Sequence, residues 1–132
     1  MLKDIPDRKV KDFAIAIVPR EEEEELWDTY LLNLKDEPIR DVLVNSRGYG
    51  DLEGEKRKTT VLRHFFREIG PDTAALLEPI QTKLFSFTNE YWVSFNYDGY
   101  MFDKKYIFVQ GSIHEMNFTK IPLLNQRGVM IK

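Results

Sequence analysis

Hydrophobic residues alternate with polar ones in short runs along this chain, and a period of two is typical of β-strands. In residues 12–19, Phe13, Ile15 and Ile17 fall on one face and the run ends at a proline. Residues 73–80 form a second apolar run of strand length that stops around Pro79. We therefore predict a strand at each of these places.

The run at residues 26–34 fits two patterns, because Leu26, Tyr30 and Leu34 would line one helix face, and the same residues with Leu32 would line one strand face. Its length and its Trp, Tyr and Thr content favour the strand. Residues 35–38, Lys-Asp-Glu-Pro, are typical of a short turn. Residues 39–46 form another apolar run, so we expect a β-hairpin that joins 26–34 to 39–46.

Residues 90–109 carry the clearest signal in the chain. Asp98-Gly99 suits a type I′ turn, whose two central residues both need a positive φ. Counting outward from this turn places aromatic residues opposite one another on one face: Tyr97 with Tyr100, Phe95 with Phe102, and Tyr91 with Tyr106. The other face is more polar and carries Trp92, Ser94, Asn96, Asp103 and Lys105. This alternation predicts a hairpin with one covered face.

Residues 59–71 carry the best helix signal. A threonine can cap the start, Val61, Phe65 and Ile69 fall on one stripe, and Gly-Pro ends the segment. Six of its residues are β-branched or aromatic, so a strand remains an alternative.

The tail at residues 121–132 is apolar enough to dock, and Val129 and Ile131 would share one strand face. Together the runs predict an all-β protein of about seven strands, with one short helix near residues 60–69. We favour an immunoglobulin-like antiparallel β-sandwich without a disulfide. An α+β domain is the alternative if the helix is complete. We expect residues 1–132 to form a single domain.

The composition narrows the class of protein. Of 132 residues, 42% are hydrophobic and 31% are charged, and the net charge is −3, which argues against disorder and against a surface that is basic all over. The absence of cysteine excludes disulfides, thiolate metal sites and cysteine nucleophiles. The N-terminus has no apolar segment typical of a signal peptide, and no run approaches the roughly 18 apolar residues of a membrane helix. We expect a soluble, cytoplasmic protein that does not enter a membrane.

The segment Asn-Ser-Arg-Gly-Tyr-Gly at residues 45–50 resembles a phosphate-binding loop only superficially. It lacks the Gly-Lys-Ser/Thr ending of a Walker loop, and it lacks the third glycine and the following helix of a dinucleotide fingerprint. We interpret it as a strand end that turns through positive φ.

The two histidines, His64 and His114, lie in no metal-binding spacing. On a helix, His64 would neighbour Glu68, a pairing found in general bases, and this is the one hydrolase or transferase arrangement that the sequence offers. The sequence indicates no serine or threonine as a nucleophile for this histidine–carboxylate pair. We therefore expect no catalytic site, no metal and no cofactor, and a protein that is not an enzyme.

Basic residues concentrate between residues 47 and 67, where six cations face three acids, a local balance of +3. Tyr49 lies among them, and cations beside exposed aromatics can grip single-stranded nucleic acid. Lys104 and Lys105 either extend this patch or protect a strand edge. The predicted binding patch consists of Arg47, Tyr49, Lys56, Arg57, Lys58, Arg63, Arg67, Trp92, Lys104 and Lys105.

Two functions follow. The first is a non-enzymatic protein-interaction or self-association module, the latter as a homodimer, that uses an exposed edge or the polar face around Trp92. The alternative is nucleic-acid or phosphate-ligand binding through residues 47–67.

The ordered segments WDTYLLNL, SRGYG, LRHFFREIGP, NEYWVSF, DKKYIF and GVMIK resemble a small family of uncharacterised bacterial single-domain proteins. The resemblance covers most of the chain from Trp27 to Lys132. It implies a single-domain protein, and it brings no activity or site residue with it.

Overall fold

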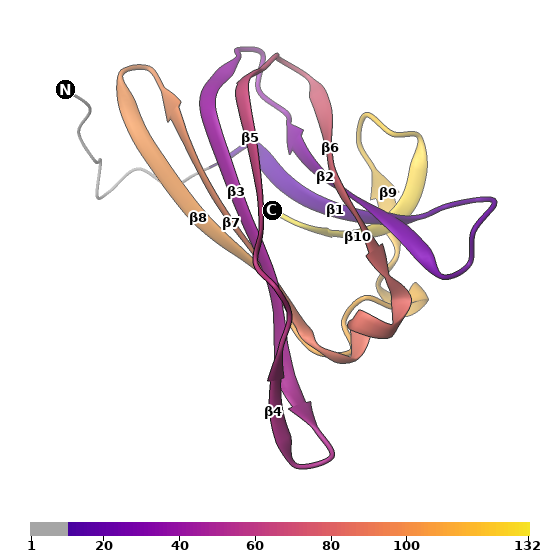
Figure 1. Cartoon of the computed structure of the whole chain (residues 1–132). Helices are drawn as coiled ribbons and strands as arrows, with labels where there is room; N and C mark the ends of the chain where they lie inside the picture. The colour runs from indigo at the N-terminus through magenta and orange to yellow at the C-terminus, as the bar shows by residue number, and fades with distance from the viewer. Residues whose placement is uncertain (1–10) are drawn as a thin grey trace.

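The computed structural model describes residues 11–132, except for the side chain of Leu52. These residues form two antiparallel sheets packed together as a sandwich (Figure 1). Sheet I has the order β6-β2-β1-β10-β9, and sheet II has the order β4-β3-β7-β8, with β5 also paired to β3. The strands are β1 (Phe13–Pro19), β2 (Leu26–Asn33), β3 (Ile39–Leu52), β4 (Glu55–Lys58), β5 (Leu62–Ile69), β6 (Thr73–Gln81), β7 (Thr88–Tyr97), β8 (Tyr100–Phe108), β9 (Thr119–Ile121) and β10 (Gln126–Ile131), with 3-10 helices η1 (Thr82–Ser86) and η2 (Glu115–Asn117).

The predicted all-β sandwich is confirmed, and its immunoglobulin-like character stays a prediction. The described part of the chain has ten strands instead of about seven, because β4 and β5 add two and the tail divides into β9 and β10. Residues 1–10, where the absence of a signal peptide was judged, lie outside the described residues.

The helix predicted near residues 60–69 is wrong, because residues 62–69 form strand β5 along the edge of β3. Val42 pairs with Phe66, and Leu43 pairs with Phe65. Phe66 packs against the core, whereas Phe65 points outward and is 63% exposed. The strand pattern with a period of two therefore outweighs the helical stripe of every fourth residue. β3 supplies a partner for backbone hydrogen bonds, whereas a short helix on its own is only marginally stable.

The hairpin predicted between residues 26–34 and 39–46 is also wrong, although both segments are strands. β2 lies between β1 and β6 in sheet I, so neither of its edges is open to β3. The connection instead crosses to sheet II, and the buried side chain of Asn33 holds it. The Asn33 amide donates to the carbonyls of Glu37, Ile69 and Gly70 at 3.0, 3.3 and 2.8 Å, and Asn33 Oδ1 accepts from Lys35 N at 3.0 Å.

The hairpin of β7 and β8 is confirmed in its register and its turn. The predicted pairs are those observed, Tyr97 with Tyr100, Phe95 with Phe102 and Tyr91 with Tyr106. Asp98 and Gly99 have φ of 52° and 75°, as a type I′ turn requires. The rings of Phe95 and Phe102 stack with centroids 5.6 Å apart.

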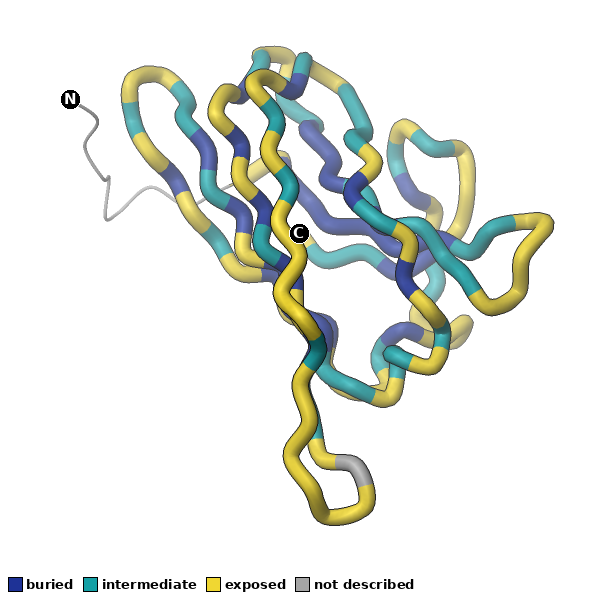
Figure 2. The backbone as a smooth tube through the Cα atoms, viewed as in Figure 1, coloured by how far each residue is buried: buried dark blue, intermediate teal, exposed yellow. Residues whose placement is uncertain are grey.

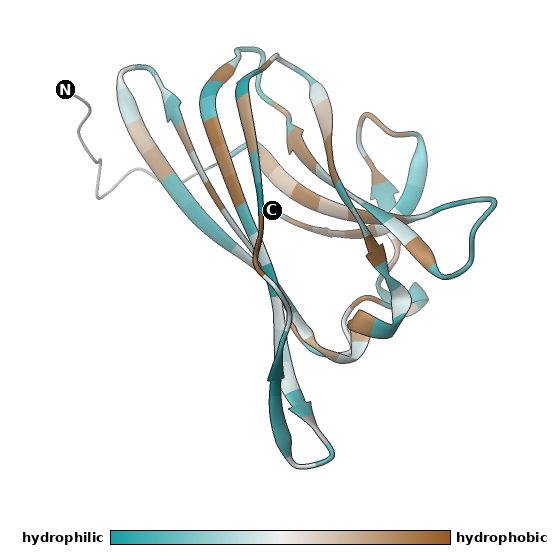
Figure 3. Ribbon diagram, viewed as in Figure 1, coloured by the Kyte–Doolittle hydropathy of each residue, from teal (hydrophilic) through white to brown (hydrophobic). Residues whose placement is uncertain are grey.

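The core lies between the sheets, and apolar bands line their facing sides (Figure 3). Phe13 of β1 meets Phe95 of β7 with ring centroids 4.7 Å apart. β1 is buried on both faces, because a second apolar cluster that includes Ile121 covers its alanine side. This double burial explains why β1 carries no charged side chain.

Burial raises the pKa of the Tyr91 and Tyr106 hydroxyls, and for Tyr91 the nearby Glu78 carboxylate adds to the rise. An unfolded tyrosine ionises near pH 10, whereas these two keep their protons in the folded state at that pH. The unfolded state thus loses protons first, so this contribution to stability is complete below about pH 10 and is lost as the pH rises above it.

We expect native protein at alkaline pH to show less phenolate absorbance at 295 nm than guanidinium-unfolded protein at the same pH. The deficit should shrink in Tyr106→Phe, because one of the three hydroxyls with a raised pKa, those of Tyr30, Tyr91 and Tyr106, is gone. Equal absorbance of native and unfolded chains, with circular dichroism still native, would contradict this prediction.

Candidate functional site

The outer face of sheet II, which points away from sheet I, exposes Met101 and Ile107 of β8 and three further large apolar side chains on the neighbouring strands β5, β3 and β7. Phe65 of β5 pairs with Leu43 of β3, and Trp92 of β7 pairs with Asn45, two positions further along β3 on the same face. Phe65, Leu43 and Trp92 are 63%, 37% and 42% exposed. Because the three strands are hydrogen-bonded in succession, these side chains form one continuous patch.

Cations flank this patch. Arg63 stands two positions before Phe65 on β5 and shares its face, and Arg67 follows two positions after Phe65 and is also exposed. Lys105 of β8 pairs with Trp92, and its Nζ lies 4.6 Å from the centre of the indole ring. Within residues 11–132, no carboxylate forms an ion pair with any of these three cations. Their charges are therefore available to a ligand.

Arg47 also lies on the outer face, but its charge is already neutralised. Its Nε donates to Glu90 Oε2 at 2.9 Å, and the Glu90 side chain is only 8% exposed. The guanidinium also lies 5.3 Å from the ring centre of Tyr49. Arg47 therefore anchors Tyr49 and Glu90 and contributes little free charge to the surface.

A two-stranded arm, residues 49–58, continues β3 beyond the sandwich and is almost wholly exposed (Figure 2). Lys58 pairs with Tyr49 and Lys56 pairs with Asp51, so both lysines share the outer face. Arg57 pairs with Gly50 and points to the opposite side, where its Nη2 contacts Glu55 at 3.0 Å.

A β-bulge joins the arm to the sheet. Tyr49 pairs with Lys58 whereas Ser46 pairs with Leu62, so two residues of β3 face residues 59–61. The extra residue reverses which side chains point outward. Even-numbered side chains face outward on β4, whereas Arg63 and Phe65 do so on β5, which brings Lys56 and Lys58 onto the same face as Arg63 and Phe65.

The interpretation of residues 45–50 as a strand end with positive φ is wrong. Gly48 and Gly50 lie inside β3, and neither has a positive φ. A Cβ on Gly48 would stand 3.1 Å from Asn89 Oδ1 and Thr59 Cγ2, so close packing accounts for this glycine. The chain turns later, at Glu53 and Gly54, with φ of 52° and 83°.

Lys104 lies apart from the other predicted residues, on the core-facing side of β8, with its Nζ 5.0 Å from the ring centre of Tyr106. A charge that points inward on an edge strand opposes pairing with another chain. The structure therefore separates Lys104 and Arg57 from the predicted patch. It brings together on the outer face Arg47, Tyr49, Lys56, Lys58, Arg63, Arg67, Trp92 and Lys105.

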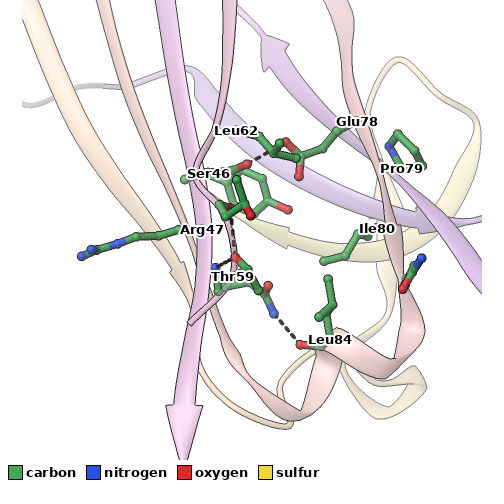
Figure 4. A pocket seen from close by; sticks show the side chains of 13 residues that line it. Ser46, Arg47, Thr59, Leu62, Glu78, Pro79, Ile80 and Leu84 are labelled. Carbon is green, nitrogen blue, oxygen red and sulfur yellow. Dashed lines mark hydrogen bonds between the residues drawn. The ribbon is translucent and has the colours of Figure 1, made fainter. Parts of the chain in front are cut away.

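A second feature, absent from the sequence analysis, lies between the edge strands β5 and β6. Glu78 of β6 reaches across to sheet II, where its Oε1 accepts from Ser46 Oγ at 2.7 Å (Figure 4). The same Oε1 lies 2.6 Å from His64 Nε2. The expected pairing of His64 with Glu68 does not occur. Residues four apart on a strand are separated by about 13 Å, and Glu68 pairs with Arg40 at 3.0 Å instead.

A cavity of about 390 Å³ opens beside this polar cluster. Leu62, Pro79, Ile80 and Leu84 give it apolar walls. Its polar lining includes Ser46, Thr59, Glu78, Asn89 and Tyr91. The Arg47 side chain points away from it (Figure 4).

The Ser46–Glu78–His64 cluster does not have the order of a catalytic triad. A nucleophilic serine needs an imidazole that accepts its proton and a carboxylate behind that imidazole. Here Ser46 donates to Glu78, and His64 contacts the same carboxylate oxygen. The cluster joins the two sheets and presents a carboxylate to the cavity.

Among the described residues, no three side chains of His, Asp or Glu gather in a way that would hold a metal ion. No helix in residues 11–132 is long and apolar enough to cross a membrane. Comparison of this chain with protein-family models, curated proteins and solved structures finds no match.

Proposed function

We propose that this protein is a non-enzymatic interaction module that binds a partner protein through the outer face of sheet II. The observation that carries the proposal is Phe65, which is 63% exposed and is flanked along β5 by Arg63 and Arg67, neither of which forms an ion pair within residues 11–132. Exposed aromatic and arginine side chains are the residue types enriched in interface hot spots. Leu43 and Trp92 extend the apolar area across three strands.

The partner's surface should present an apolar side chain with carboxylates around it. The apolar strip of Leu43, Phe65 and Trp92 requires burial against apolar atoms, and the flanking cations favour acidic neighbours. The acidic loop at residues 21–25 of a second copy has the required charge, and all five of its glutamates are exposed. Self-association through that loop is therefore one form of the same interaction.

Nucleic-acid binding is the second candidate, favoured by the arm, where Lys56 and Lys58 lie beside Tyr49 on the outer face. The acids on that face weigh against it. Asp41, Asp51, Glu90 and Asp103 stand among six cations. A phosphate backbone would meet these carboxylates as well as the cations.

The test compares affinity capture from nuclease-treated host lysate by wild type, Phe65→Ser and Leu76→Ser. Leu76 is 54% exposed on β6 of sheet I, so it is a matched control. We expect a stoichiometric protein that wild type and Leu76→Ser retain and that Phe65→Ser binds about thirtyfold more weakly, the effect of a hot-spot truncation. Light scattering of the purified protein identifies a second copy as the partner if the mass rises with concentration.

Capture that is equal for wild type and Phe65→Ser would refute the proposed face. Binding of an oligo-dT strand that weakens steeply with salt, and that depends on Lys56 and Lys58 but not on Phe65, would assign the surface to nucleic acid instead.

A further inference from the structure

Three side-chain donors in the polar wall of the cavity between β5 and β6 already make hydrogen bonds within the protein. Ser46 Oγ donates to Glu78, and Thr59 Oγ1 donates to the Thr60 carbonyl at 3.1 Å. The Asn89 amide donates to the carbonyls of Leu84 and Phe87 at 2.9 and 3.2 Å. These three donors are therefore committed within the protein.

Besides the exposed side chains of Thr60 and Gln81, the polar wall offers acceptor atoms from Glu78 and Asn89. Among the described residues, no group donates to Glu78 Oε2, although the Glu78 side chain is only 11% exposed. Asn89 Oδ1 likewise has no donor, and it faces the wall at Gly48, 3.1 Å from where a Cβ would stand. A carboxylate in a confined site is stabilised by additional donors, and a cation is the strongest partner for it.

We propose that this cavity binds a small organic amine, with its ammonium group on Glu78 and its apolar body against Leu62, Ile80 and Leu84. A volume of about 390 Å³ suits a molecule of one or two rings. The guanidinium of Arg47, a residue of the cavity lining, is turned to the other face and paired with Glu90, so it does not compete for the carboxylate. His64 contacts Oε1 and leaves Oε2 to the cavity.

This site is independent of the proposed interaction face, since it opens between the sheets and the face lies on the opposite side of sheet II. A purely structural role for Glu78, joining β6 to β3 and β5, makes a different prediction. In that case the cavity would not distinguish a cationic ligand from a neutral one of the same shape.

The experiment follows backbone amide shifts in ¹H–¹⁵N spectra as three indole compounds are added: cationic tryptamine, neutral tryptophol and anionic indole-3-propionate. We expect saturable shifts around Gly48 and Ile80 with tryptamine, with affinity at least about tenfold above that of tryptophol, the effect of one charged hydrogen bond. Indole-3-propionate should bind weakest.

Two variants locate the effect. Glu78→Gln should lower tryptamine to the affinity of tryptophol. Thr60→Trp, which fills the mouth and leaves the carboxylate intact, should weaken both compounds, whereas Val61→Trp outside the lining should not. If Glu78→Gln fails to fold, the Thr60 and Val61 pair decides the location. Equal affinity for all three compounds, no saturable shift with tryptamine, or shifts away from the cavity would overturn the proposal.

Discussion

Replacing Asn33 with aspartate is expected to lower the free energy of unfolding at pH 7 by about 4 kcal/mol. The Asn33 amide group donates to three backbone carbonyls, and the residue is fully buried. A carboxylate of the same shape would face these carbonyls with no proton to donate. The folded state would have to keep the new carboxyl group protonated, and at pH 7 this costs about 1.4 kcal/mol for each pH unit above its ordinary pKa near 3.9.

The same reasoning fixes the pH dependence of Asn33→Asp. The pKa of the new carboxyl group is raised in the folded state, so the folded state binds the extra proton as the pH falls from 7 towards 4. The deficit relative to wild type should therefore shrink over that range, as urea denaturation at pH 7 and pH 4.5 would show. A deficit that is the same at both pH values would mean that the amide hydrogen bonds are not what holds the crossing from β2 to β3.

Gly128→Ala is expected to lower the free energy of unfolding by about 3 kcal/mol. Gly128 lies in β10 beside β1, and an added Cβ would stand 2.5 Å from the Ile17 carbonyl oxygen and 2.7 Å from Val18 Cγ1. The oxygen belongs to the backbone of a strand buried on both faces, so it cannot move away without separating β10 from β1. Hydrogen exchange should accelerate first at the amides of these two strands.

Gly70→Ala is the matched control for Gly128→Ala. A Cβ there would meet Thr73 Oγ1 at 3.6 Å, an ordinary contact, and Gly70 has no positive φ. Its free energy of unfolding should stay within about 0.5 kcal/mol of wild type. Equal losses in the two variants would show that close approach at β10 is not the cause.

The parts of the fold that could be predicted from sequence are those whose signal is local. Asp98-Gly99 determines the turn, the turn determines the register, and the register places the aromatic pairs of β7 and β8. The turn at residues 35–38 is also local, but the same residues suit a hairpin and a crossing between sheets. The choice between them depends on β6, which occupies the free edge of β2 and comes from 40 or more residues later in the chain.

The sequence favoured a helix over the strand alternative for β5 because one of the inward side chains of β5 is polar. His64 points to the interior, where Glu78 of a distant strand satisfies it, so residues 62–69 do not show a simple apolar alternation. The cavity could not be predicted either, because its polar residues come from distant parts of the chain: Ser46 and Glu78 are 32 positions apart. The cations of the outer face were identified, but the bulge at residues 59–61 decides which of them share a side.

The order of strands in sheet I has a consequence for how this protein folds during its synthesis on the ribosome. β1 lies in the middle of the sheet, yet one of its neighbours, β10, is made from residues 126–131. Until β10 has been synthesised, one edge of the apolar strand β1 therefore stays unpaired. Unpaired strand edges make nascent chains prone to aggregation. The fold should thus complete itself late and cooperatively, and chaperones that shield apolar strand edges should matter more for its yield than for its final stability.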